Sequence, residues 1–450
     1  MDRIVISGSA SGAGKTSIAT GLMAALSRRE TVQAYKIGPD FIDPMYHKAV
    51  TGRPSRNLDG FMMGADTIKG QFHSTSSDAD LCVIEGVRGL YEGVHALEDT
   101  ASTAQIAKLL DAPVVLVMDA RSLTRSAAAM VMGFKIFDPD VRIAGVILNN
   151  VSGDVHKRKL RTAVEELAGT EVLGFVSRRR EAPMSVRHLG LKTVHDDTDK
   201  DWVRTLEEML EEVDIDRLRE LASTAAPLEH HECQEETVRT AEGLIAAVPR
   251  DEAFSFYYPE NLEGLEARGF KVVSYSPVGG EDLPDADLHF LGGGYPELKA
   301  EDISDNLGFI HGLRSAHEEG IPIYGECGGL MALCETITDM EGNKHKMAGL
   351  LPADCAMEPV RQGLSYVEAE PTGSKGKTVR GHEFHYSSTV LRKEVDYAYR
   401  MMRGRGIDGN HDGIMVGSAE GRYMHRHALA DDDPIGSMTL HAVKASEQRR

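Results

Sequence analysis

Short apolar runs alternate with helix-like stretches through the first half of the chain. Several runs consist of Val, Ile and Leu without polar alternation, which is typical of strands buried on both faces of a parallel sheet. Helices are expected over residues 14–27 and 100–110. The runs that we interpret as strands are residues 4–7, 32–37, 81–85, 113–119, 143–149 and 172–176. The pattern predicts an α/β fold with a mostly parallel sheet covered by helices.

The strand pattern stops in an acidic interval and then resumes. Residues 196–241 are rich in Asp and Glu, and we expect only one helix there, over residues 202–210. Later strands are expected at residues 244–248, 272–275, 288–291 and 321–324. We therefore predict an N-terminal α/β domain over residues 1–195, a helical and acidic linker over 196–241 and a second α/β domain over 242–450.

Composition narrows the class of protein. The 450 residues contain 70 Asp and Glu against 50 Lys and Arg, a net charge of −20, which argues against nucleic acid or an anionic membrane as partner. No apolar run approaches the roughly 18–20 residues needed to cross a bilayer, and the N-terminus lacks a secretory apolar region. Five scattered cysteines do not suggest a disulfide framework. We expect a cytoplasmic protein.

A loop of small residues follows the first predicted strand. Residues 8–16 read Gly-Ser-Ala-Ser-Gly-Ala-Gly-Lys-Thr and lead into a predicted helix. Gly12 and Gly14 would let backbone N–H groups approach phosphate oxygens closely, at a helix N-terminus that favours anions. Lys15 would reach the β- and γ-phosphates of a nucleotide, and the Thr16 hydroxyl would bind Mg²⁺. Five residues, not the usual four, separate the first glycine from Gly14.

Carboxylates follow two other predicted strands. Glu85 closes one apolar strand, and Asp40 and Asp43 come just after another. Because parallel strands end at one edge of a sheet, these acids could hold Mg²⁺ beside the phosphate loop. Asn149 closes the fifth predicted strand, where its amide could contact a nucleotide base or simply form a turn.

A second chemical site centres on Cys327. The sequence Gly-Glu-Cys-Gly-Gly lies between an apolar strand and an apolar helix, which is the pattern of a nucleophile on a sharp turn. The helix N-terminus would stabilise the thiolate, and backbone N–H groups of Gly293 and Gly294 could form an oxyanion hole. The candidate bases are His382, His385, His425 and His427. Their spacing also fits a metal site, although no thiolate ligands stand nearby.

These motifs, in this order, resemble the cobyrinic acid a,c-diamide synthases, a family that includes close relatives acting on nickel-sirohydrochlorin. The resemblance covers nearly the whole chain. It rests on residues 11–16, 36–44, 52–59, 85–93, 187–191, 250–254, 292–297, 325–329 and 381–387.

The resemblance implies ATP- and glutamine-dependent amidation of the a and c acetate groups of a tetrapyrrole. A dethiobiotin-synthetase-like P-loop domain would use ATP and Mg²⁺ to activate a carboxylate as an acyl phosphate, with Asp40 and Asp43 as catalytic residues. Thr16, Asp40 and Glu85 would hold the metal. A class I glutamine amidotransferase-like domain would release ammonia at Cys327, with His425 as the catalytic histidine.

The C-terminal segment departs from the family pattern. Most class I glutaminases carry Glu two residues after the catalytic histidine, and this chain, like the family it resembles, has His427 there. The family usually reads Ser-Tyr-x-His-Leu-His-Phe, whereas this chain has Arg422, Arg426 and Ala428. Two extra cations beside the expected base leave the efficiency of the glutaminase open.

The substrate of such an enzyme carries many carboxylates. Guanidinium groups bind carboxylates in bidentate fashion, so the sequence offers candidate anchors that could equally form surface salt bridges. These anchors are Arg53, Arg56, Arg187 and His188.

Two alternatives remain open from the sequence. Nickel-sirohydrochlorin presents equivalent acetates to the same enzyme type, and only the resemblance around residues 38–40 favours cobyrinate. A P-loop switch ATPase with a non-catalytic glutaminase-like domain would hydrolyse ATP without consuming glutamine. The expected partners are the tetrapyrrole, glutamine and ATP, with neither nucleic acid nor membrane, and a homodimer is one expected assembly.

Overall fold

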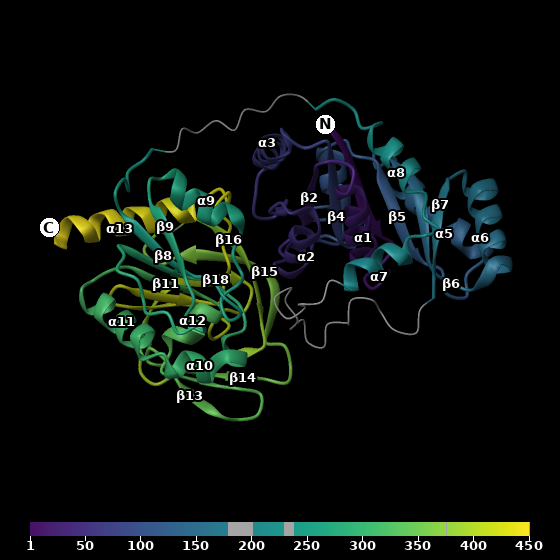
Figure 1. Cartoon of the computed structure of the whole chain (residues 1–450). Coiled ribbons are helices and arrows are strands. Elements are labelled where there is room, and N and C mark those ends of the chain that lie inside the picture. The colour runs from purple at the N-terminus through teal and green to yellow at the C-terminus, as the bar shows by residue number, and fades with distance from the viewer. Residues whose placement is uncertain (179–200, 229–237, 375, 450) are drawn as a thin grey trace. The chain divides into compact units, whose positions relative to one another are not determined.

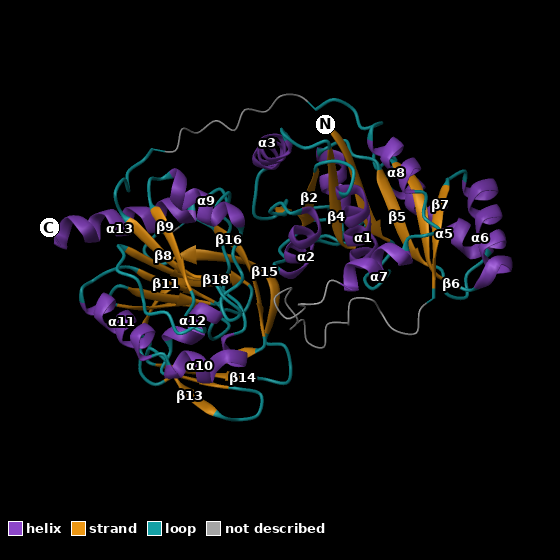
Figure 2. Ribbon diagram, viewed as in Figure 1, coloured by secondary structure: helices purple, strands orange, loops and turns teal. Residues whose placement is uncertain are grey.

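The computed structural model describes residues 1–178, 201–228, 238–374 and 376–449 (Figure 1). The chain divides into two compact units, Met1–Gln234 and Glu235–Arg450. Each unit is an α/β structure with its own sheet and core (Figure 2). The predicted fold class is therefore confirmed. Among the described residues, no helix combines the length and the apolar character that crossing a bilayer would demand.

The first unit is built on a seven-stranded sheet of order β3-β2-β4-β1-β5-β6-β7, in which every neighbouring pair is parallel. Its strands are β1 (Asp2–Gly8), β2 (Val32–Ile37), β3 (Arg56–Leu58), β4 (Leu81–Gly89), β5 (Val114–Asp119), β6 (Ile143–Val151) and β7 (Val172–Ser177). Its helices are α1 (Lys15–Ser27), α2 (Ile42–Thr51), α3 (Ala65–Ser76), α4 (Thr103–Leu109), α5 (Arg125–Phe137), α6 (Gly153–Ala168), α7 (Asp201–Met209) and α8 (Ile215–Ala222).

Helices α7 and α8 fall within the segment that the sequence predicted to be a linker. α7 matches the expected helix, whereas α8 was not expected. Both carry buried leucines, such as Leu206 and Leu218, that pack into the core around β1 and α1. A Cβ atom at Gly21 of α1 would lie 3.1 Å from the carbonyl oxygen of Leu206, so this glycine permits the close packing of α7 on α1. This part of the interval thus belongs to the first unit.

The second unit combines parallel and antiparallel strands in a nine-stranded sheet of order β16-β15-β18-β19-β20-β11-β10-β8-β9. The β9-β8-β10-β11-β20 half is parallel, and the half from β20 to β16 is antiparallel. The strands are β8 (Ile245–Pro249), β9 (Lys271–Tyr275), β10 (Leu288–Leu291), β11 (Ile323–Glu326), β15 (Gly363–Pro371), β16 (Val379–His385), β18 (Asp396–Arg403), β19 (His411–Val416) and β20 (Ala419–Arg422).

A smaller four-stranded sheet, of order β13-β12-β14-β17, completes the strands of this unit. It contains β12 (Thr336–Thr338), β13 (Lys344–Lys346), β14 (Ala353–Met357) and β17 (Ser387–Leu391). The helices are α9 (Pro259–Ala267), the 3-10 turn η2 (Pro296–Lys299), α10 (Ala300–Asp305), α11 (Leu307–Glu318), α12 (Gly328–Leu333) and α13 (Pro434–Arg449). The sequence predicted the four parallel strands β8 to β11 but none of the antiparallel ones, whose residues are more polar and only partly buried.

Candidate active sites

The phosphate loop joins the end of β1 to the start of α1. Gly12 and Gly14 adopt left-handed backbone angles, with φ of 80° and 90°. A Cβ atom at Gly14 would lie 2.1 Å from Nδ2 of Asn149, so only glycine fits at this point. Asn149 also donates a hydrogen bond of 2.9 Å to the carbonyl oxygen of Ala13. The side chain of Asn149 therefore braces the loop from the end of β6, and a contact with a nucleotide base stays a prediction.

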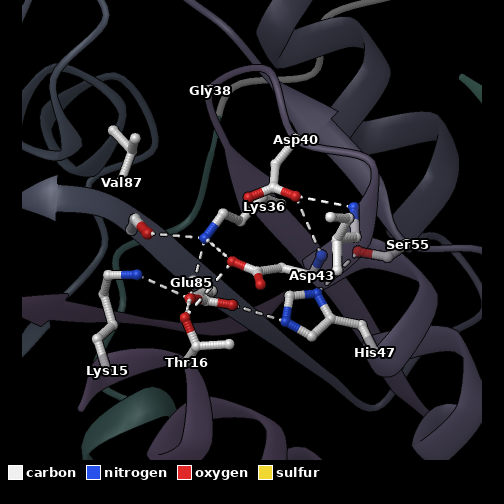
Figure 3. Close-up of polar contacts among 12 residues, drawn as sticks. Lys15, Thr16, Lys36, Gly38, Asp40, Asp43, His47, Ser55, Glu85 and Val87 are labelled. Carbon is white, nitrogen blue, oxygen red and sulfur yellow. Dashed lines mark hydrogen bonds and ion pairs between the residues drawn. The ribbon is translucent and has the colours of Figure 1, made fainter. Parts of the chain in front are cut away.

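Four charged or polar side chains converge on Glu85 of β4 at the mouth of this loop (Figure 3). Its Oε1 accepts hydrogen bonds from Lys15 at 2.7 Å, from Thr16 at 2.6 Å and from Lys36 at 2.9 Å. Lys36 of β2 also donates to Oδ2 of Asp43 at 2.6 Å, and Thr16 lies 3.4 Å from the same oxygen. The structure thus joins Lys15, Thr16, Asp43 and Glu85, as the sequence predicted, and adds Lys36.

The other oxygen of Glu85 is held from α2. Nε2 of His47 lies 2.8 Å from Oε2 of Glu85, and Nδ1 of the same ring lies 3.1 Å from the Ser55 hydroxyl. Asp40 also contacts the start of α2, where its Oδ1 accepts the backbone N–H groups of Ile42 and Asp43. Its role as a metal ligand stays a prediction. This contact orients the turn that carries Asp43, and Asp43 is the acid beside Thr16.

Neighbouring opposite charges keep Glu85 and Lys36 ionised although both side chains are buried. Burial opposes charge on Glu85, but Lys15 and Lys36 outweigh it and hold the pKa of Glu85 well below its ordinary value. Burial likewise opposes charge on Lys36, yet Asp43 and Glu85 raise its pKa above the ordinary range. Burial lowers the pKa of Lys15. The cluster therefore offers carboxylate and hydroxyl oxygens to a hard cation and an ammonium group to phosphate.

The donor set fits a nucleotide with Mg²⁺. Magnesium prefers oxygen ligands and binds through one or two carboxylates together with phosphate oxygens, and Thr16, Glu85 and Asp43 supply such atoms. The left-handed glycines leave room that a side chain would fill.

A pocket of about 300 Å³ also opens near the carboxyl ends of β5, β6 and β7. Its lining residues are Arg121, Ser122, Leu123, Thr124, Asn150, Ser152, His156 and Arg178.

The expected substrate anchors have different fates. Arg53 forms a bidentate ion pair with Asp78, at 2.6 and 3.0 Å, and donates to Oε1 of Gln33, so its contacts are those of a surface salt bridge. Arg56 begins β3 and is partly buried. Arg187 and His188 lie outside the described residues.

Cys327 sits on a sharp turn between β11 and α12, with φ of 50° and ψ of −99°. The glycines around it are sterically required: a Cβ atom at Gly325 would lie 2.6 Å from the backbone of Gly329, and one at Gly329 would lie 2.2 Å from the carbonyl oxygen of Leu291. Cys327 is 7% exposed, and burial together with nearby Glu297 raises the pKa of its thiol. An activating base must therefore remove its proton.

The glycine loop after β10 lies against this turn. A Cβ atom at Gly328 would stand 3.1 Å from the backbone nitrogen of Gly294, and one at Gly293 would stand 2.5 Å from Cε1 of His425. The loop therefore touches both the residue after Cys327 and the predicted base. This arrangement gives backbone N–H groups of Gly293 and Gly294 a place in the same site.

The four candidate histidines have distinct surroundings. His425 is buried against Gly293 and stacks on His382, with ring centroids 5.0 Å apart. His382 is hydrogen-bonded to the hydroxyl of Tyr258 at 2.7 Å. His385 stacks on Tyr423, and His427 lies 3.5 Å from Glu260. No group of three or more His, Cys, Asp or Glu arranged for a metal is found in the described parts of the chain, so the alternative metal site gains no support.

The two arginines that depart from the family pattern are paired with acids. Arg422 donates to Glu326 at 2.8 Å and to Glu420 at 2.7 Å. Arg426 pairs with Asp432. Their charges are therefore offset locally, instead of facing His425 alone.

Sequence reasoning missed three residues of these sites: Lys36, His47 and Glu326. Lys36 and Glu326 lie within motifs whose other members were assigned roles, and their position beside known candidates was the available signal. His47 had no signal beyond its place one helical turn after Asp43.

Comparison with known proteins agrees with this division into two sites. Residues 4–189 match the CobQ/CobB/MinD/ParA nucleotide binding domain, and residues 245–433 match the CobB/CobQ-like glutamine amidotransferase domain. The match to a solved structure of PurLQS from Thermotoga maritima covers 45% of this chain and 99% of that one, at 16% identity and a TM-score of 0.34.

Curated relatives match the chain over almost its full length, and each is named cobyrinate a,c-diamide synthase. The protein of Methanothermobacter thermautotrophicus is 44% identical over 98% of this chain and 99% of its own. That of Methanosphaera stadtmanae is 43% identical over 96% and 97%. That of Methanocaldococcus jannaschii is 43% identical over 97% and 98%. The chain therefore belongs to the cobyrinate a,c-diamide synthase family and is a glutamine-dependent amidoligase.

Proposed function

We propose that this enzyme uses ATP, Mg²⁺ and glutamine to convert the a and c acetate carboxylates of cobyrinate into amides, a step of cobalamin biosynthesis. The name shared by its full-length relatives supports the substrate. The presence in one chain of a phosphate loop and a strained cysteine supports the chemistry. The proposed division of labour gives activation to the first unit, Met1–Gln234, and ammonia release to the second unit, Glu235–Arg450.

In the activating reaction, a substrate carboxylate oxygen attacks the γ-phosphorus of ATP and ADP leaves, so that a poor electrophile gains phosphate as its leaving group. Backbone N–H groups at Gly12 and Gly14 and the ammonium of Lys15 would bind the phosphates. Thr16, Glu85 and Asp43 would hold Mg²⁺, which neutralises developing charge when bound. Asp40 would also serve the metal and activation site, besides orienting the start of α2. The pocket beside Asn150 would take the nucleoside.

In the ammonia-releasing reaction, His425 takes the proton of Cys327 and the sulfur attacks the side-chain carboxamide of glutamine. Gly293 and Gly294 would donate hydrogen bonds to the oxyanion. The C–N bond then breaks, and His425 returns the proton to the leaving ammonia. Water hydrolyses the thioester to glutamate. The ammonia attacks the acyl phosphate, phosphate leaves, and the amide forms.

The test is mass spectrometry of product made from ATP, Mg²⁺, amide-¹⁵N glutamine and either cobyrinate or nickel-sirohydrochlorin. Two successive amidations of cobyrinate that carry the label are expected. Faster turnover of the nickel compound would replace the proposed substrate, and ATP hydrolysis without glutamine consumption would favour the switch ATPase.

Cys327→Ser supplies the matching test of the nucleophile. Glutamine-supported amidation should disappear while ammonium-supported amidation continues, because ammonia bypasses the thioester. Loss of both reactions in a folded protein would mean that Cys327 has a structural role instead.

A further inference from the structure

Neighbouring residues hold the ring of His425 in place. To act as a base through Nε2, the ring also needs an acceptor for a proton on Nδ1. Gly293 lies so close to the ring that an added Cβ atom would be 2.5 Å from Cε1 of His425. The ring of His382 stacks on the ring of His425, with 18° between the two planes. These contacts fix the plane of the imidazole. They do not decide which nitrogen carries the proton, which is set by the group that Nδ1 meets.

Nδ1 of His425 meets Glu326, the residue immediately before the predicted nucleophile. The distance from Nδ1 to Oε2 of Glu326 is 3.4 Å. Such contacts are often long without substrate and shorten in the reacting complex. Glu326 ends β11 and Cys327 begins the turn, so one backbone segment carries both the acid and the thiol.

Glu326 is held as a carboxylate in a fixed orientation. It is 3% exposed, and its other oxygen accepts a hydrogen bond of 2.8 Å from Arg422. Burial opposes its charge, but Arg422 and His425 outweigh that effect and lower the pKa of Glu326. Arg422 is itself fixed by Glu420 at 2.7 Å. The ion pairs thus direct Oε2, the oxygen not bound to Arg422, to His425.

We propose that Glu326 is the positioning residue of the ammonia-releasing site: it accepts the Nδ1–H of His425, so that Nε2 is left to take the proton of Cys327. The inference rests on the proposed function, because it assumes that His425 is the base. It also assigns a role to Arg422, which fixes the acid. The nearby His427 contacts a different acid, Glu260.

The test compares Glu326→Gln with Glu420→Gln. Each substitution removes one carboxylate partner of Arg422, but only Glu326 contacts His425. Both variants and Cys327→Ser are assayed for amidation supported by glutamine and by ammonium, with thermal unfolding as a check on folding. Glu326→Asp, which keeps a charge for Arg422 but shortens the reach to His425, serves if Glu326→Gln does not fold.

Glu326→Gln should lower kcat with glutamine at least ~10-fold and change KM little. For reference, neutralising the acid of a Ser-His-Asp triad lowers kcat ~10⁴-fold. Its ammonium-supported rate should stay that of wild type. Glu420→Gln should keep the ammonium-supported rate and lose much less of the glutamine-supported rate than Glu326→Gln, because the contact of Glu326 with His425 remains. The glutamine-supported rate of Glu326→Asp should lie between those of Glu326→Gln and the wild type. The proposal would be overturned if Glu326→Gln and Glu420→Gln had equal glutamine-supported rates and Cys327→Ser had none. Glutamine use by Cys327→Ser would instead overturn the proposed function.

Discussion

Replacing Lys36 with Met should destabilise the first unit through its buried charges. Lys36 is 3% exposed and bridges Asp43 and Glu85 at 2.6 and 2.9 Å. Methionine has a similar length but no charge. After the substitution Glu85 keeps its contacts with Lys15 and His47, whereas Asp43 loses its shortest ion pair.

The expected magnitude follows from the burial of the group that remains. Removing one partner of a buried ion pair costs about 3–5 kcal/mol, because the other charge stays in a poorly solvated site. For a urea dependence of about 3 kcal/mol per molar, the unfolding midpoint should fall by about 1–2 M. Nucleotide-dependent activity should fall as well, since Asp43 and Glu85 would repel each other.

Fluorescence of Trp202 provides the assay. It is the only tryptophan in the chain, and its ring lies edge-on to Tyr46 of α2, the helix that carries Asp43, with centroids 5.4 Å apart. Urea titrations therefore follow the first unit. The exposed Lys159→Met on α6 is the control and should change the midpoint little. A midpoint for Lys36→Met equal to that of the control would refute the reasoning.

Three further results are expected. Gly14→Ala should weaken nucleotide binding at least ~10-fold in calorimetric titrations. The new Cβ atom would lie 2.1 Å from Nδ2 of Asn149 and displace that side chain, and alanine is strained at the left-handed backbone angles of this position. Unchanged affinity would contradict this. Gly293→Ala should abolish glutamine-supported but not ammonium-supported amidation, since the new methyl group meets His425; equal loss of both would point to misfolding. The pKa of Glu85 in the folded protein lies below the ordinary value of about 4.3, so the stabilisation from this ionised group is present above that pH. It is lost as the pH falls and the folded protein takes up the proton. A free energy of unfolding that rises from pH 5 to pH 3 would contradict this expectation.

Local sequence was sufficient for most of the parallel strands and for both chemical loops, but the short strands β3 and β20 were not predicted. Strand β5 is an almost continuous apolar run because both of its faces are buried. The glycines beside Lys15 and Cys327 are visible as local patterns, although Asn149 and Leu291, which lie far away in the chain, supply contacts that require them. The antiparallel strands lack that signal, since one face of each is partly exposed. Helix α8 was not recognised in its acidic segment because few of its residues, Leu218, Leu221 and Ala222, are buried in the core.

What the sequence could not determine is which distant side chains share a buried site. Residue type and spacing made Lys15, Glu85 and Cys327 candidates, because a phosphate loop, an acid at the end of a strand and a cysteine on a sharp turn are local patterns. The ion pair between Lys36 and Glu85 and the contact between Glu326 and His425 join residues far apart in the chain. Only the packing of strands at 4.7–4.9 Å spacing brings such groups within hydrogen-bonding distance, and burial then gives their charges the strength to orient one another.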